Sequence, residues 1–173
     1  TGIEFILAFI AGYEVETRLA EMSGFAHYDK GWHGTATYGT FGAAAAAAKL
    51  LGLNEYQTTT ALGIAATQAA GLKAMFGTMC KPLHAGKAAS NGLLAARLAK
   101  KGFTSRPDAI ECAQGFADTQ ADGFEALPVK ISHNEKLAVE ENLFKYHASC
   151  YLTHAGIDAI KSLRDENNIK VEQ

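Results

Sequence analysis

The chain has 173 residues and a mass of 18.4 kDa, the size of one ordinary domain or slightly more. Hydrophobic residues make up 48% and charged residues 20%, which excludes a wholly disordered chain because enough apolar surface exists to form a core. Basic residues number 16 against 18 acidic ones, so the net charge of -2 excludes the basic surface that nucleic-acid binding requires. Every apolar run is too short to cross a bilayer. We therefore expect neither nucleic acid nor membrane as a partner.

The cysteines indicate the redox environment of the protein. Cys80, Cys112 and Cys150 form no Cys-x-x-Cys pair and leave one thiol over, so disulfide bonds are not expected. We expect a reducing compartment, the cytoplasm or, if the source is eukaryotic, the mitochondrial matrix.

The chain is in an amphipathic pattern directly after Thr1, and it stops at Gln173 just after an apolar alternation has begun. We interpret it as an internal piece of a longer protein.

Apolar residues at helical spacing dominate the first two thirds of the chain. The first pattern, from Ile3 to Met22, predicts a helix with Ile3, Ile6 and Leu7 on one apolar face. A polar, glycine-rich loop is expected over residues 26–37. Further helices are predicted over residues 41–51, 54–70, 82–101 and 107–112.

Several residues mark where these helices begin and end. Asn54 is a suitable N-cap, and Pro82 suits the first position of a helix. Glycines that follow the helical patterns predict their ends, at Gly52, Gly71 and Gly102. Six consecutive alanines lie at 43–48, and we expect this face to pack closely against the glycine and alanine face of residues 88–99.

The pattern changes after about Gly123. Strands are predicted over residues 126–131 and 169–171 and a helix over residues 151–163, whereas residues 139–146 fit either structure. The predicted fold class is therefore mainly α. An all-α domain over residues 1–123 leads into the beginning of a smaller α/β domain over residues 124–173.

The strongest candidate for a ligand site is the run from Gly77 to Lys87. Pro82 would place Lys81 at the cap of a helix, where free N–H groups and the helix dipole attract anions. His84 lies one turn into this helix, and Gly86 leaves room for close approach, so the run predicts a carboxylate site. The spacing equally allows a solvated lysine and a packed surface histidine.

A second candidate is His33, in a glycine-flanked loop beside the only tryptophan. A histidine there is well placed for acid or base chemistry near neutral pH. On spacing alone, however, a histidine that only caps the following helix is favoured.

The third candidate is the segment from His147 to His154. His147, Cys150 and His154 are spaced so that a single helix would align them as a zinc site does, but the ligand set is incomplete and no metal is expected. His154 is better explained as facing a pocket from the first turn of its helix, with Lys145 and Tyr146 ahead of it.

Three separated motifs resemble the MmgE/PrpD family. They are residues 31–37 with 42–53, residues 81–89 continuing to 104, and Lys145-Tyr146 with Cys150 and residues 153–155. Their common order and register cover nearly the whole chain. The resemblance implies a large all-α domain, a smaller α/β lid, assembly as a homodimer and an active site between the domains. It implies no metal or organic cofactor.

The resemblance also assigns roles to single residues. His33, Lys81 and His154 fall where the family places catalytic residues. Substrate binding is expected of the residues around them, namely Lys81, His84, Gly86, Lys145 and Tyr146. Which histidine is acid and which is base stays open.

The family's substrates are small di- and tricarboxylates, so the resemblance implies a lyase that needs cations for the carboxylates and a histidine to move a proton. The leading interpretation is a hydro-lyase similar to 2-methylcitrate dehydratase, in propionate metabolism. The alternatives are a decarboxylase of cis-aconitate or an epimerase of iminodisuccinate on the same scaffold. A non-catalytic helical module is a further interpretation, because a family helix bearing an aspartate and another histidine is not in this sequence. We expect these residues alone to be inactive.

Overall fold

The computed structural model describes residues 1–125 and 136–170. It contains two compact units, Thr1–Glu140 and Glu141–Gln173. Helices dominate the described residues, which form no strand, and this confirms a mainly α fold. The predicted strand at 126–131 lies outside the described residues, and the one at 169–171 is not formed at its two described positions. The α/β lid therefore stays a prediction.

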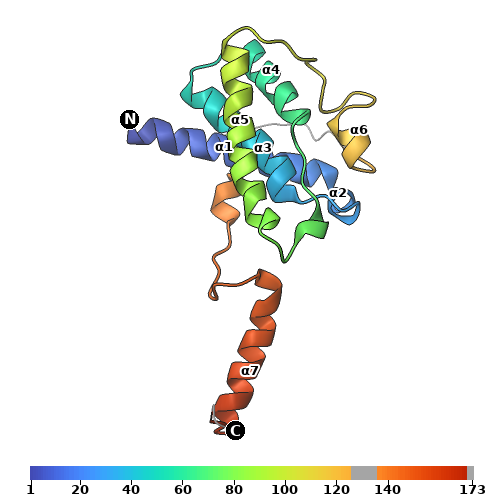
Figure 1. Cartoon of the computed structure of the whole chain (residues 1–173). Coiled ribbons are helices and arrows are strands. Elements are labelled where there is room, and N and C mark those ends of the chain that lie inside the picture. Colours follow the sequence, from blue (N-terminus) through green and yellow to red (C-terminus); the bar gives the residue numbers. More distant parts are fainter. Residues whose placement is uncertain (126–135, 171–173) are drawn as a thin grey trace. The chain divides into compact units, whose positions relative to one another are not determined.

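The first unit is a group of helices packed around α3 and α5 (Figure 1). Its elements are α1 (Gly2–Ser23), α2 (Ala26–Asp29), α3 (Gly34–Leu50), α4 (Glu55–Ala66), the 3-10 helix η1 (Lys73–Met75), α5 (Cys80–Lys100), α6 (Phe116–Gln120) and, at its end, η2 (Ala138–Glu141). α1 and α5 both pack on α3, and α4 contacts α3 and α5. The core combines a few large side chains, such as Phe41 and Phe116, with many alanines.

The contact between α3 and α5, which we call the seam, is made of alanine and glycine. Ala44 and Ala95 are fully buried, at 0% exposure. A Cβ atom added to Gly92 would lie 2.5 Å from the backbone nitrogen of Ala44 and 2.7 Å from the carbonyl carbon of Ala43. The two backbones therefore approach as closely as small residues allow, and the close packing predicted for these faces is confirmed.

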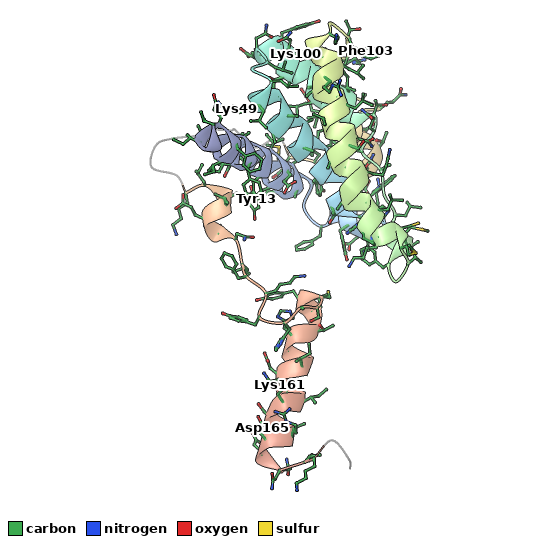
Figure 2. All side chains as sticks on the ribbon, turned by 60° about the vertical axis from the view of Figure 1, so that its left-hand side comes forward. Tyr13, Lys49, Lys100, Phe103, Lys161 and Asp165 are labelled. Carbon is green, nitrogen blue, oxygen red and sulfur yellow. The ribbon has the colours of Figure 1, made fainter. Side chains whose placement is uncertain are left out.

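Local end signals position the helices of this unit. Asn54 caps α4 in a capping box, because its Oδ1 accepts from the Gln57 N–H at 2.9 Å and the Gln57 side chain accepts from the Asn54 N–H at 3.2 Å. Gly52 and Gly102 follow α3 and α5 with φ of +64° and +86°, as helix-ending glycines do. Lys100, labelled in Figure 2, is the last residue of α5. Its ammonium donates to the Leu51 carbonyl at 3.0 Å and ties the ends of α3 and α5 together.

Two predicted boundaries of these helices were wrong at the N-terminal side. α3 begins at Gly34 rather than at residue 41, because the last residues assigned to the loop already belong to the helix: the Thr37 hydroxyl donates to the His33 carbonyl at 3.4 Å. α5 begins at Cys80, so Pro82 is its third residue and not its first.

Two C-terminal features also differ from the prediction. α4 ends at Ala66, so Gly71 does not end it. Residues 107–112 form turns instead of a helix, and the unpredicted α6 follows, with the Phe116 N–H donating to the Ala109 carbonyl at 2.9 Å. Burial of Phe116 in the core explains why this short segment folds back.

The first half of α1 leaves its apolar side chains uncovered. Ile3, Ile6 and Leu7, which share the predicted apolar face, are 71%, 57% and 50% exposed. The second half carries the contact with α3, where a Cβ atom on Gly12 would lie 2.6 Å from the Gly42 carbonyl oxygen. None of the helices in the described part of the chain combines the length and hydropathy needed to span a membrane.

The second unit contains the 3-10 helix η3 (Tyr151–Thr153) and α7 (His154–Glu166). The helix predicted over residues 151–163 is therefore present, with a 3-10 turn at its start. Residues 147–150 are not helical, so His147 and Cys150 are not aligned with His154 on one helix. Across residues 1–125 and 136–170, no group of three or more histidine, cysteine and acidic residues is placed to hold a metal ion.

Candidate active site

Two loops of the first unit pair with each other and bring the starts of α3 and α5 together. The His33 N–H donates to the Gly71 carbonyl at 2.9 Å, and the Lys73 N–H donates to the Gly31 carbonyl at 2.8 Å. Trp32 and Leu72 form an isolated antiparallel bridge between these bonds. The pairing fixes His33 beside the segment that leads into α5.

The centre of the site is a pair of histidines. Nδ1 of His33 lies 2.8 Å from Nδ1 of His84, 51 positions along the chain. His33 is buried at 8% exposure and His84 is half-buried. His33 occupies the N-cap position of α3, but its side chain makes no capping bond and contacts His84 instead. Capping therefore does not explain this histidine.

Phe76 joins the pair to Lys81. The rings of His33 and Phe76 contact each other edge to face, with their centroids 4.8 Å apart. The Lys81 ammonium lies over the same Phe76 ring, 5.1 Å from its centroid. The structure thus brings together His33, Lys81 and His84, three of the predicted site residues. Phe76 was missed by the sequence analysis, and its only signal is an aromatic residue within a turn-rich segment.

Gly71 provides the space for His84. A Cβ atom at this position would collide with the Ala36 side chain and would lie 3.3 Å from Cδ2 and Nε2 of the His84 ring. Gly71 is therefore needed for close packing beneath the site, and nothing in the sequence indicated this beyond the glycine itself. Gly86, by contrast, has nothing within 4 Å of its Cβ position and lies on an open face of α5.

The surroundings of His33 favour its neutral form. Burial lowers the pKa of His33, and the nearby His84 and Lys81 charges lower it further. A neutral imidazole retains a lone pair, so His33 is suited to accept a proton near neutral pH.

The start of α5 differs from the predicted anion site in one respect. The Cys80 N–H donates to the Thr78 hydroxyl and the Lys81 N–H donates to the Thr78 carbonyl, both at 3.2 Å. Pro82 has no N–H to offer. The first turn therefore has no free backbone donors at these positions, and the attraction for an anion comes from the exposed Lys81 ammonium and the helix dipole.

The remaining predicted site residues belong to the second unit. His154 is buried at 7% exposure, and its Nε2 has no hydrogen-bond partner among the described residues. Its ring stacks on Tyr151 and meets His147 edge to face, with centroids 5.0 Å away in each case. Lys145 and Tyr146 are exposed. That these residues share a site with His33 stays a prediction.

His147 has a partner of its own, the Asp158 carboxylate, with Nε2 at 2.8 Å from Oδ1. This contact holds the pKa of Asp158 below its usual value. Through His147 the pair is part of the packing around His154.

His27 is a buried histidine outside the site. Its Nδ1 lies 3.2 Å from the Gln120 carbonyl and its Nε2 lies 2.7 Å from the Thr37 hydroxyl, and its ring is fully buried. Burial lowers its pKa. A neutral ring that donates from Nδ1 and accepts at Nε2 satisfies both contacts, so His27 belongs to the core.

A cavity of about 580 Å³ opens between α1, α3 and α5. Its walls are mainly apolar and include Gly34 and Ala85, the chain neighbours of His33 and His84. The charged residue in its wall is Glu16, whose pKa is raised by burial. Among the described residues, the cavity wall therefore offers no cation to a carboxylate, whereas Lys81 offers one at the start of α5.

Comparison with known proteins places the chain in a family. The family model for the MmgE/PrpD N-terminal domain matches residues 1–127. Cis-aconitate decarboxylase of Homo sapiens is 35% identical over 166 residues, which are 95% of this chain and 34% of that protein. The enzymes of the same name from Aspergillus terreus and Mus musculus are 35% and 36% identical, again over 95% of this chain and over 35% and 34% of their own length. The chain spans about a third of these relatives, and it belongs to the MmgE/PrpD family.

Proposed function

We propose that the complete protein is a lyase acting on a small di- or tricarboxylate, and that this chain supplies part of its active site. The observation that carries the proposal is the His33–His84 contact of 2.8 Å beside the Lys81 ammonium. A proton acceptor and a fixed cation at neighbouring helix ends suit this chemistry, and membership of the MmgE/PrpD family supports it.

The roles of the residues follow from their chemistry. Lys81 binds a substrate carboxylate and neutralises the charge that develops next to it when a proton or CO2 leaves the adjacent carbon. His33, held neutral by its surroundings, takes up or returns the proton. His154 is the second proton-transfer group, Lys145 and Tyr146 are further substrate contacts, and His84 and Gly86 contribute to substrate binding together with Lys81.

Two reactions are the main candidates. Decarboxylation of cis-aconitate comes first, because the relatives with about 35% identity carry that name. Loss of water from 2-methylcitrate, with a role in propionate metabolism, is the second candidate and is favoured by the motif resemblance. We further propose a homodimer without metal or organic cofactor, in a reducing compartment, and light scattering on the complete protein measures its oligomeric state.

The experiment incubates the complete protein with cis-aconitate, 2-methylcitrate, citrate and iminodisuccinate and follows the products by NMR. Loss of CO2, loss of water and epimerisation give different products, so one panel separates the three reactions. Lys81→Ala should lower kcat/KM at least tenfold, since a charge-assisted hydrogen bond is worth about 1.5–3 kcal/mol. His33→Ala should lower kcat with little change in KM and remove one limb of the pH–rate profile.

Lys101→Ala is the matched control, because Lys101 is an exposed lysine directly after the same helix. It should keep the parent activity. Near-parent efficiency of Lys81→Ala on every substrate turned over would show that Lys81 is not the carboxylate clamp. If the complete protein turns over none of the four substrates, the non-catalytic interpretation replaces the lyase.

A further inference from the structure

The His33–His84 contact fixes how many protons the pair holds. A hydrogen bond between two Nδ1 atoms 2.8 Å apart needs one N–H and one lone pair, so a single proton lies between the rings. In the neutral pair the ring that donates has a bare Nε2, and the ring that accepts has an Nε2–H. Two protonated rings would direct two N–H groups at each other and break the contact.

The two Nε2 atoms are free to exchange protons. Neither has a hydrogen-bond partner among the described residues, and neither is among their fully enclosed polar atoms. The Nε2 edge of His84 passes over Gly71, where the missing side chain leaves room. The pair therefore has two open ends, one acidic and one basic, joined through one shared proton.

We propose that His33 and His84 act as one proton relay, in which a proton that enters at Nε2 of one ring leaves from Nε2 of the other. The proposal rests on the lyase function proposed above and gives His84 a role other than carboxylate binding. It makes the pair able to take a proton from one position and deliver it to another without either ring rotating.

The steps of the relay conserve protons and charge. Nε2 of the donating ring accepts a proton and that ring becomes an imidazolium. Its Nδ1 proton then crosses the 2.8 Å contact to Nδ1 of the second ring, which now carries the positive charge. Loss of the Nε2 proton from the second ring restores a neutral pair with the tautomers exchanged.

The charge next to the pair disfavours protonation of His33. Lys81, on α5, is the cation whose charge reaches His33, and it disfavours a lasting imidazolium. Lys73 of η1 contacts Tyr28 instead, with its ammonium 2.7 Å from the Tyr28 carbonyl.

The first measurement tests the shared proton without any substrate. Histidine 15N NMR of the chain, recorded from about pH 8 to about pH 5 across the ordinary histidine pKa of ~6.5, should show one coupled proton uptake by His33 and His84. In His84→Gln, His33 should titrate as a single independent group. Independent titration of both rings in the parent chain would overturn the proposal.

The second measurement tests the transfer in the complete protein. The amide that H84Q introduces can still form a hydrogen bond with Nδ1 of His33 but cannot pass a proton on. H84Q should therefore lower kcat roughly tenfold or more while KM stays within about twofold. Added imidazole should restore part of the turnover of His84→Ala. Lys101→Gln, a change of an exposed lysine directly after the same helix, is the control.

The outcomes are distinguishable. If H84Q is as fast as the parent enzyme, His84 only orients His33 and the relay is wrong. If the parent enzyme turns over no polycarboxylate, the proposed function fails, whereas the NMR titration still decides whether the two rings share one proton.

Discussion

Replacement by alanine should have opposite effects on stability at two glycines of α5. Gly92 faces the seam, where an added Cβ would lie 2.5 Å from the Ala44 nitrogen and 2.7 Å from the Ala43 carbonyl carbon. Carbon atoms in contact normally lie about 3.5–4.0 Å apart, so Gly92→Ala must separate α3 from α5 by about 1 Å. Gly86 has nothing within 4 Å of its Cβ position, so Gly86→Ala meets no obstacle.

Two contributions set the changes in the free energy of unfolding. Alanine gains about 0.8–1.0 kcal/mol over glycine within a helix at either position. Overpacking costs about 1–3 kcal/mol, and only Gly92→Ala incurs it. Gly86→Ala should therefore raise the free energy of unfolding above that of the parent. The free energy of unfolding of Gly92→Ala should be about 1–3 kcal/mol lower than that of Gly86→Ala.

Urea unfolding of the two variants and the parent measures these differences, and equal slopes would show that the unfolded states are comparable. Equal stability of Gly86→Ala and Gly92→Ala would refute the close approach of α3 and α5. Gly86→Ala also has a functional use in the complete protein. A more stable variant with weaker substrate binding would show that Gly86 is kept for a ligand.

Three further predictions concern the core and the second unit. Ala45→Leu and Ala95→Leu should each cost about 1–3 kcal/mol, and unchanged urea midpoints would show that these alanines are not packed in the core. Burial lowers the pKa of His27 in the folded chain, so on acidification the unfolded chain takes up this proton first. The contribution of the neutral His27 to the free energy of unfolding is complete above about pH 6.5. It declines as the pH falls towards the pKa of His27 in the folded chain. Urea titrations at about pH 7.5 and pH 5.5 should show a smaller loss for His27→Gln than for the parent, and equal losses would contradict this assignment. The purified chain should bind no stoichiometric zinc by elemental analysis, and zinc that disappears in His154→Ala would revive the metal interpretation.

The sequence predicted those features that depend on neighbouring residues. The Asn54 cap, the helix ends at Gly52 and Gly102, and the alanine-rich contact were all confirmed. Each depends on interactions within a few residues or on side-chain size, which the sequence states directly. The start of α3 was missed because threonine is typical of loops unless its hydroxyl bonds to a carbonyl one turn back, as that of Thr37 does to His33.

The site was predictable only in part. Its residue types were found, because a histidine between glycines and a Lys-Pro-Leu-His run have chemical meaning in any fold. The contact of His33 with His84 was not predicted, since it depends on the pairing of residues 31–33 with residues 71–73 across the unit. The occupied N–H groups at the start of α5 depend in turn on Thr78, whose hydroxyl direction no spacing rule gives.

The seam has a consequence for how the site can move. Alanine has no side-chain rotamers and glycine has no side chain, so a contact built from them cannot adjust by changing rotamers. α3 and α5 therefore form one rigid support, and the positions of their backbones set the distance between His33 and His84. Any adjustment of this site is left to the turn over residues 71–79, which carries Phe76 and holds no α-helix.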